Sequence, residues 1–74
     1  MTPLPRISGK ECVAALVRAG FQRDRQTGSH VILTRTEPYA MTVVPVHKEL
    51  GPGLLRSIIR QAGMTVDEFV EYLK

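Results

Sequence analysis

The chain has 74 residues, of which 43% are hydrophobic and 23% are charged, as is ordinary for one small globular domain. No apolar run approaches the roughly 18 residues of a membrane span, and no apolar signal-peptide region opens the chain, so we expect a single cytoplasmic domain over residues 1–74 with no membrane association. Cys12 is the only cysteine, which excludes an internal disulfide framework and fits a reducing compartment.

The net charge of +3 is unevenly distributed along the chain. Residues 1–62 contain nine Lys and Arg against four Asp and Glu, a net +5, whereas residues 63–74 contain one Lys against three acids, a net −2. Seven of the ten cations are arginine, whose guanidinium binds phosphate bidentately and stacks on bases. A basic body with an acidic tail favours a nucleic-acid partner, although many solvated protein surfaces have the same composition.

The first predicted element is a helix over residues 9–19. Ser8 and Glu11 have the spacing of a capping box, in which side chains satisfy the first free amides of a helix. Gly20 suits the C′ position, and Phe21 supplies the hydrophobic contact beyond it. One face of this helix is apolar and is expected to be buried; it carries Cys12, Val13, Leu16 and Val17.

Three strands are predicted next, over residues 21–26, 29–35 and 40–46. Thr27-Gly28 forms the first turn, and residues 36–39 form the second. Pro45 favours an edge position for the third strand, because proline cannot donate a ladder hydrogen bond. The three strands are expected to form an antiparallel meander.

Two helices complete the chain. Pro52 suits the first turn of a helix that continues to Ala62 and ends at Gly63. Thr65 and Glu68 form a second capping box and open a short final helix. The order α-β-β-β-α-α predicts an α+β fold, with a three-stranded antiparallel sheet covered by helices on one face.

The predicted turns imply a strand register. Arg25 would pair with His30, Arg23 with Ile32, and His30 with Pro45. This register places one set of polar residues together on one sheet face: Arg23, Arg25, His30, Pro45 and His47. Diagonal neighbours on such a face lie roughly 7–8 Å apart, so His30 and His47 are expected to approach one another.

The same register gives the opposite face Val31, Leu33, Val44 and Val46, an apolar surface for the helices. It also leaves several apolar residues on the open face, namely Phe21, Ile32, Met41 and Val43. A hydrophobic partner on that face would account for them.

His30 follows Gly28 and Ser29 at the mouth of the first hairpin, close to two arginines. Histidine is the side chain that most readily exchanges a proton near neutral pH. It can act as a general base that removes the proton from a ribose 2′-hydroxyl, whose oxygen then attacks the neighbouring phosphate. RNA supplies this nucleophile itself, so neither a metal nor a protein nucleophile is required. The structural alternative is a turn histidine that hydrogen-bonds the backbone.

The other candidates have weaker patterns. His47 is a candidate general acid or phosphate contact, or else a strand-end histidine that orders the next loop. Arg25 is a candidate contact to the scissile phosphate or a support for His30, and equally a solvated surface cation. Ser29 is either a supporting residue or a turn residue. Further candidate contacts to an RNA backbone, each also explicable as a surface charge, are Lys10, Lys48, Arg56 and Arg60.

The sequence predicts neither a catalytic cysteine nor a metal site. Cys12 near a helix N-terminus is a conceivable nucleophile, but its place in an apolar stripe favours a small core residue. His30, His47 and Cys12 lack the paired spacing of metal ligands, and a structural zinc requires four. We therefore expect no metal and no cofactor.

Several short motifs recur here in a familiar order and spacing: Ser8-Gly9-Lys10-Glu11, Ala19-Gly20-Phe21, Arg25-Gln26-x-Gly28-Ser29-His30, Val44-Pro45-Val46-His47, Gly51 through Ala62-Gly63, and Glu68-Phe69. With this ordered set the chain closely resembles the HicA family of bacterial toxins over nearly its whole length. No single tripeptide is specific, but the set in a chain of this length is.

The resemblance implies a double-stranded-RNA-binding-domain-like fold and a metal-independent endoribonuclease that cleaves mRNA. It implies that the required histidine is the one in the Gly-Ser-His motif, His30. It also implies a cognate HicB antitoxin that covers and silences the toxin in a hetero-oligomer. Many relatives have a second histidine directly after the first; here that residue is Val31, so any role of an adjacent imidazole is absent.

Two other functions are compatible with the same residues. One is an RNA-binding module that uses this fold without catalysis, and the other is an adaptor whose open sheet face meets only a protein partner.

Overall fold

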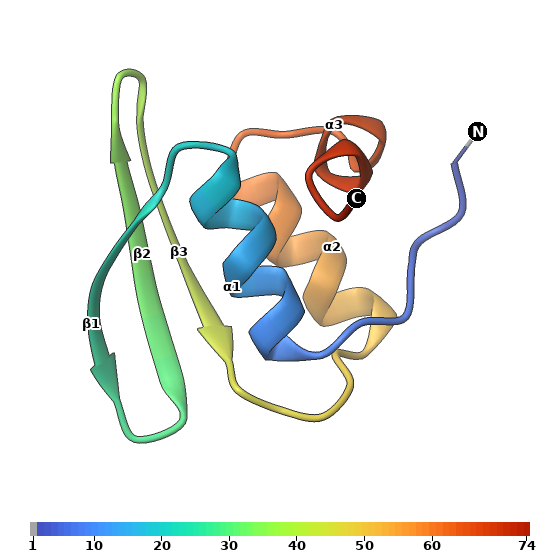
Figure 1. Cartoon of the computed structure of the whole chain (residues 1–74), viewed down its shortest axis with the longest axis horizontal. Helices are drawn as coiled ribbons and strands as arrows, with labels where there is room; N and C mark the ends of the chain where they lie inside the picture. Colours follow the sequence, from blue (N-terminus) through green and yellow to red (C-terminus); the bar gives the residue numbers. More distant parts are fainter. Residues whose placement is uncertain (1) are drawn as a thin grey trace.

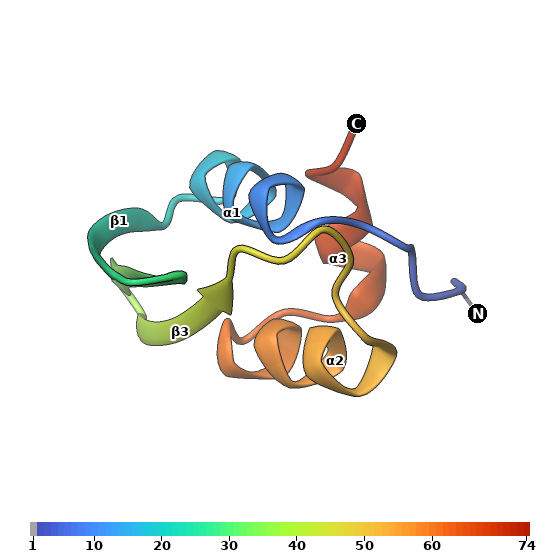
Figure 2. The same cartoon turned by 90° about the horizontal axis from the view of Figure 1, so that it is seen from below.

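A computed structural model describes residues 2–74. The elements follow the order α1 (Gly9–Arg18), β1 (Gln22–Thr27), β2 (His30–Thr36), β3 (Tyr39–Pro45), α2 (Pro52–Gln61) and α3 (Val66–Glu71). All six predicted elements are present, and the α+β class is confirmed. In Figures 1 and 2 the sheet forms one layer and the helices pack together on one side of it.

Local sequence signals set the ends of α1. The Ser8 side chain accepts a hydrogen bond from the Glu11 amide, and the Glu11 carboxylate accepts one from the Ser8 amide, as a capping box requires. At the other end Gly20 has φ of 107°, and the Phe21 amide donates to the Leu16 carbonyl at 2.9 Å. This pair of features is the predicted glycine C-cap.

The three strands form an antiparallel sheet in the order β1-β2-β3. β3 is therefore an edge strand, and Pro45 ends it, as predicted. The pairing of β2 with β3 also agrees with the predicted register, because His30 lies opposite Pro45 and Arg35 lies opposite Ala40.

The predicted pairing of β1 with β2 was wrong. The turn is at Gly28-Ser29 rather than Thr27-Gly28, so His30 pairs with Thr27 and Ile32 pairs with Arg25. A register shift between Arg23 and Arg25 then inserts one extra residue, Asp24, into β1. Such a bulge turns the following side chains to the other face of the sheet.

The bulge separates the two arginines. Arg25 stays on the face of His30. It pairs with Ile32, which follows His30 by two residues in β2 and therefore points to the same face. Arg23 pairs instead with Leu33, whose side chain is buried under the helices. Arg23 therefore lies on the helix side of the sheet, contrary to the prediction.

The two C-terminal helices start and end as predicted. Pro52 occupies the first turn of α2, and the Met64 amide donates to the Ile59 carbonyl beyond Gly63, whose φ is 74°. Thr65 and Glu68 form the second capping box at the start of α3.

The core lies between the sheet and the helices. Side chains from β2 and β3 alternate, and those on the helix side are buried: Val31, Leu33, Ala40, Thr42 and Val44. They pack with apolar residues of the helices, chiefly Leu16, Leu55, Ile58, Ile59 and Phe69. Thr42 is the buried polar member of this set, and its hydroxyl hydrogen-bonds the Gln61 side-chain carbonyl at 3.0 Å.

Two apolar residues differ from the prediction, Phe21 in its face and Val46 in its burial. Phe21 is buried rather than on the open face, and the Arg35 guanidinium lies 4.8 Å from the centre of its ring. Val46 is 41% exposed, because the chain has already left the sheet after Pro45. Ile32 and Val43 remain half-buried, and Met41 is exposed, on the face away from the helices.

Candidate functional site

The site is organised around the tight turn that connects β1 to β2. Gly28 has φ of 59°, a conformation that glycine adopts without steric cost and that a two-residue hairpin turn needs at its first central position. The Gln26 side-chain amide donates to the Gly28 carbonyl at 3.0 Å and secures the turn. His30 is the first residue of β2 after this turn, and its side chain is exposed.

Backbone hydrogen bonds join this turn to the end of β3 and to the start of α1. The Val46 amide donates to the Ser29 carbonyl at 2.6 Å, and the Gly9 amide donates to the His47 carbonyl at 2.9 Å. A side chain at position 9 would collide with the Pro45 carbonyl oxygen. Three segments that are far apart in sequence therefore meet at one end of the sheet.

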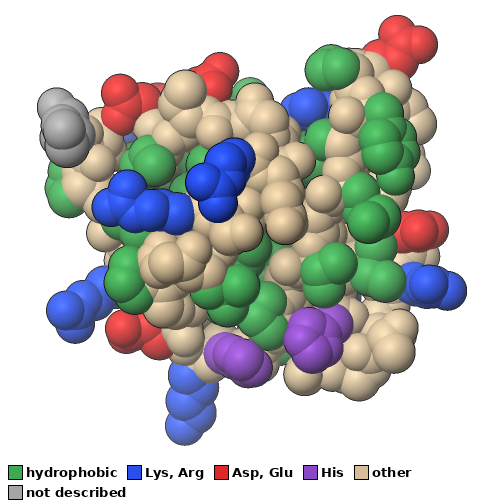
Figure 3. Space-filling view, turned by 180° about the vertical axis from the view of Figure 1, so that it is seen from behind, with side chains coloured by type: hydrophobic (Ala, Val, Ile, Leu, Met, Phe, Trp, Pro, Cys, Tyr) green, Lys and Arg blue, Asp and Glu red, His purple; other side chains and the backbone are tan. Residues whose placement is uncertain are grey.

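This junction brings the two histidine motifs together. His30 lies opposite Pro45 in the sheet, and His47 follows Pro45 by two residues. Both histidine side chains are exposed, and both are visible along the lower edge of the face in Figure 3. None of the side-chain hydrogen bonds within residues 2–74 involves either imidazole. No hydrogen bond from the His30 imidazole to the backbone of the turn is found among the described residues.

His47 differs from the prediction in one respect. It is not part of the sheet face, because β3 ends at Pro45 and the amide of His47 turns back to donate to the Pro45 carbonyl at 2.9 Å. Its position is set by the junction with α1 and not by strand alternation.

The other candidates divide into those near the junction and those distant from it. Arg25 shares the sheet face of His30, Ser29 is in the turn, and Lys48 follows His47 directly; all three are exposed. Lys10 is in the first turn of α1 and lines a groove on the helix side of the sheet. Arg56 lines a hollow with Asp67 and the N-terminal segment, so the structure does not bring it to His30.

Arg60 is exposed on the last turn of α2. That helix packs against β3 and α3, whereas the turn before His30 joins β1 to β2. Fewer cations therefore lie near His30 than the sequence suggested as candidates.

Cys12 is a core residue, as its apolar stripe predicted. Its side chain is fully buried, and desolvation by burial raises the pKa of the thiol to about 12. A thiol with a raised pKa is a poor nucleophile at neutral pH, because the thiolate is the reactive form.

Over the described part of the chain, residues 2–74, no three His, Cys, Asp or Glu side chains group as metal ligands would. In the same range no helix has the length and apolar character needed to cross a membrane.

The comparison with known families identifies the chain. A family model described as the HicA toxin of bacterial toxin–antitoxin matches residues 9–64, a range that runs from the start of α1 past the end of α2 and contains both histidine motifs. A search of curated proteins finds no match to the chain. Since the matched range is well over half of its length, the chain belongs to the HicA toxin family of toxin–antitoxin systems.

Proposed function

We propose that this toxin is a metal-independent endoribonuclease that cleaves mRNA, that His30 is its general base, and that a HicB-like antitoxin neutralises it. The observation that carries the proposal is the environment of His30. The imidazole is exposed at the start of β2, takes part in none of the side-chain hydrogen bonds within residues 2–74, and shares a sheet face with Arg25. It is therefore free to meet RNA.

The proposed step uses the 2′-hydroxyl of the RNA itself. His30 takes the hydroxyl proton, the oxygen forms a bond to the adjacent phosphorus, and the bond from phosphorus to the 5′-oxygen of the next nucleotide breaks. The leaving oxygen takes up a proton, from His47 or from water, and a cyclic phosphate results. A general base contributes roughly 10²–10⁴-fold to such a rate.

The cations have a supporting role in this scheme. Arg25 would neutralise charge on the scissile phosphate, as positive groups do for oxyanions that develop in a transition state. Ser29 and Lys48 lie at the same junction and would hold neighbouring phosphates, whereas Lys10 lines the groove on the helix side and is not assigned this role. The backbone links from Ser29 to Val46 and from Gly9 to His47 hold the turn before His30 and the backbone of His47 at one end of the sheet, which supports a joint role for the two residues.

The test is cleavage of an RNA oligonucleotide by the purified chain in the presence of EDTA. His30→Ala is expected to lower the rate by at least roughly 100-fold, while its circular dichroism and thermal unfolding stay as in the unmodified chain. His47→Ala serves as the matched control for removal of an exposed imidazole and is expected to have a smaller effect. An oligonucleotide with a single 2′-deoxy nucleotide at the cleaved position should resist cleavage there.

Two results would contradict the proposal. Undiminished cleavage by a folded His30→Ala chain would remove the proposed base. RNA binding without cleavage by the unmodified chain, falling steeply with salt and indifferent to His30, would favour the non-catalytic RNA-binding module.

A further inference from the structure

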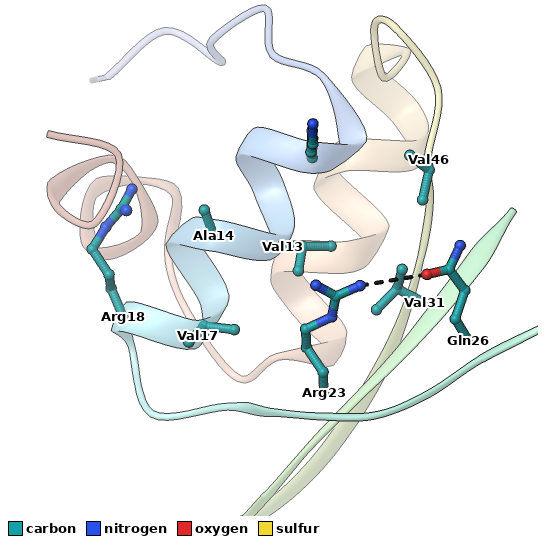
Figure 4. A pocket seen from close by; sticks show the side chains of 9 residues that line it. Val13, Ala14, Val17, Arg18, Arg23, Gln26, Val31 and Val46 are labelled. Atoms are coloured by element: carbon teal, nitrogen blue, oxygen red, sulfur yellow. Dashed lines mark hydrogen bonds between the residues drawn. The ribbon is translucent and has the colours of Figure 1, made fainter.

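A groove runs along α1 on the side of the sheet opposite to His30. It has a volume of about 570 Å³ and lies between α1 and the strands β1 and β2. Val13 and Val31 form its buried floor, and its walls are Ala14, Val17 and Val46. Figure 4 shows these small aliphatic side chains around one hollow. Val17 is 44% exposed and Val46 is 41% exposed, so the groove presents apolar surface to solvent.

The rim of the groove is cationic. Lys10, Arg18 and Arg23 line it, and the remaining polar residue of the lining is Gln26. In the described residues 2–74 no acidic side chain contributes to this lining. Arg23 reaches the rim because of the bulge at Asp24, and its guanidinium extends over the groove toward the Gln26 side chain, 3.4 Å from its carbonyl oxygen (Figure 4).

One of the rim cations is already partly engaged. The Arg18 Nε donates to the Tyr72 carbonyl at 2.7 Å and so holds the end of α3 against α1. Arg23 and Lys10 make no ion pair within residues 2–74. The positive charge at the rim is thus available to an incoming anionic group.

We propose that this groove is the anchoring site for an acidic, aliphatic segment of a protein partner, with leucine-like side chains on the valine floor and carboxylates on Arg23 and Lys10. The inference deepens the proposed function and rests on it, because the antitoxin is the partner that would supply the segment. Complementary charge on the rim gives orientation and specificity, and apolar side chains in the hollow give affinity.

Protein is favoured over RNA as the occupant. Single-stranded RNA is held by aromatic side chains on which bases stack, and the lining over residues 2–74 is aliphatic, without an aromatic ring. The acidic α3 of a second copy is a poor occupant, since Phe69 is buried in its own core and Val66 and Leu73 pack against that core.

The position of the groove explains how a bound partner would silence the site. Val46 is in its wall, and the Val46 amide holds the Ser29 carbonyl of the turn before His30. An occupant anchored on Val46 is therefore one residue from His47 and adjacent to the turn, and needs little additional length to cover both imidazoles.

The test compares two aspartate substitutions at equally exposed aliphatic positions. Val17→Asp changes the groove, and Leu54→Asp, 41% exposed on α2, is the matched control. Each variant is titrated by calorimetry with a purified HicB-like antitoxin. We expect Val17→Asp to raise the dissociation constant roughly tenfold or more, as for a central interface contact. Leu54→Asp should change the constant by no more than about twofold.

Charge is tested separately. Arg23→Glu is expected to weaken binding and to reduce its salt dependence, whereas Arg6→Glu, an exposed cation outside the groove, should do neither. A photo-crosslinking residue at the exposed Ala14 should capture an antitoxin peptide that contains aspartate or glutamate beside leucine, isoleucine or valine. The crosslink remains informative if Val17→Asp does not fold.

The outcomes separate the two proposals. Equal affinities for Val17→Asp and Leu54→Asp, or a captured peptide without carboxylates, would overturn the groove assignment and leave His30 untouched. Loss of RNA cleavage by Val17→Asp with unchanged antitoxin affinity would assign the groove to RNA instead. If the unmodified chain does not bind the antitoxin at all, the pairing itself is refuted, and the groove proposal with it.

Discussion

The two faces of the sheet are built from alternate residues of the same strands, and they have opposite properties. Along β2, Val31 and Leu33 are at most 1% exposed beneath the helices, whereas His30 is exposed and Ile32 is half-buried on the other face. The helix side thus supplies the packing that stabilises the fold. The open side contributes less to stability, which leaves its residues free for binding and chemistry.

The largest expected effect comes from truncating neighbouring aliphatic residues on the two faces. Leu33→Ala removes a fully buried side chain and should lower the free energy of unfolding by about 2–5 kcal/mol, because the cavity left behind cannot fully collapse. Ile32→Ala on the open face should cost about 1 kcal/mol. Urea unfolding of both variants measures the difference, and equal losses would contradict the one-sided core.

The next effect concerns the junction where the two faces meet at the ends of the strands. Gly9→Ala would place a methyl group against the Pro45 carbonyl and within 2.9 Å of the Val46 Cα, so we expect a loss of about 1–3 kcal/mol. Gly53→Ala in the first turn of α2 has open space and should be neutral or stabilising by up to about 1 kcal/mol. Thermal unfolding distinguishes them, and a neutral Gly9→Ala would mean that the junction is loosely packed.

Gly9→Ala also tests whether the junction positions the histidines. Displacement of the Gly9 amide from the His47 carbonyl would shift the backbone that holds His47. Amide chemical shifts of Ser29, Val46 and His47 should then change together, more than those of α3.

Local signals in the sequence were sufficient to predict the helices and strands. They also predicted which residues of β2 and β3 face the helices. Ser8 with Glu11 and Thr65 with Glu68 mark helix starts through hydrogen bonds within four residues, so no tertiary information is needed. Alternation along β2 and β3 correctly separated Val31 and Leu33 from His30.

The bulge at Asp24 could not be predicted in the same way. β1 is polar and exposed along its whole length, so no alternation of burial specifies its register. The position of Arg23, and with it the charged rim of the groove, depends on that one inserted residue. The close approach of Gly9 to Pro45 could not be predicted either, since only the tertiary fold brings these residues together.

A smaller effect is expected for the buried threonine of the helix side. Thr42→Val keeps the shape but removes the hydroxyl that bonds the Gln61 side chain at 3.0 Å, and should cost about 1 kcal/mol. Thr34→Val, half-buried on the open face, should have little effect or a slight stabilising one, because valine suits a strand. Urea unfolding again provides the measurement; a stabilised Thr42→Val would show that the buried hydrogen bond contributes nothing net.

The smallest expected effect is on the pH dependence of stability. It comes from the thiol of Cys12, which is buried on the helix side, in contrast to the exposed imidazole of His30. Burial raises the pKa of the Cys12 thiol to about 12, whereas an unfolded thiol ionises near about 8.5, so the folded chain keeps a proton that the unfolded chain loses above that pH. This contribution to stability is complete below about pH 8.5 and decreases as the pH rises, by less than about 1 kcal/mol between pH 7 and pH 9. Cys12→Ala should remove that part of the pH dependence, and iodoacetamide at pH 8 should alkylate the native chain far more slowly than the urea-unfolded chain. An unchanged pH profile in Cys12→Ala, or rapid alkylation of the folded protein, would show that the helix side admits solvent and that the two faces differ less than their packing indicates.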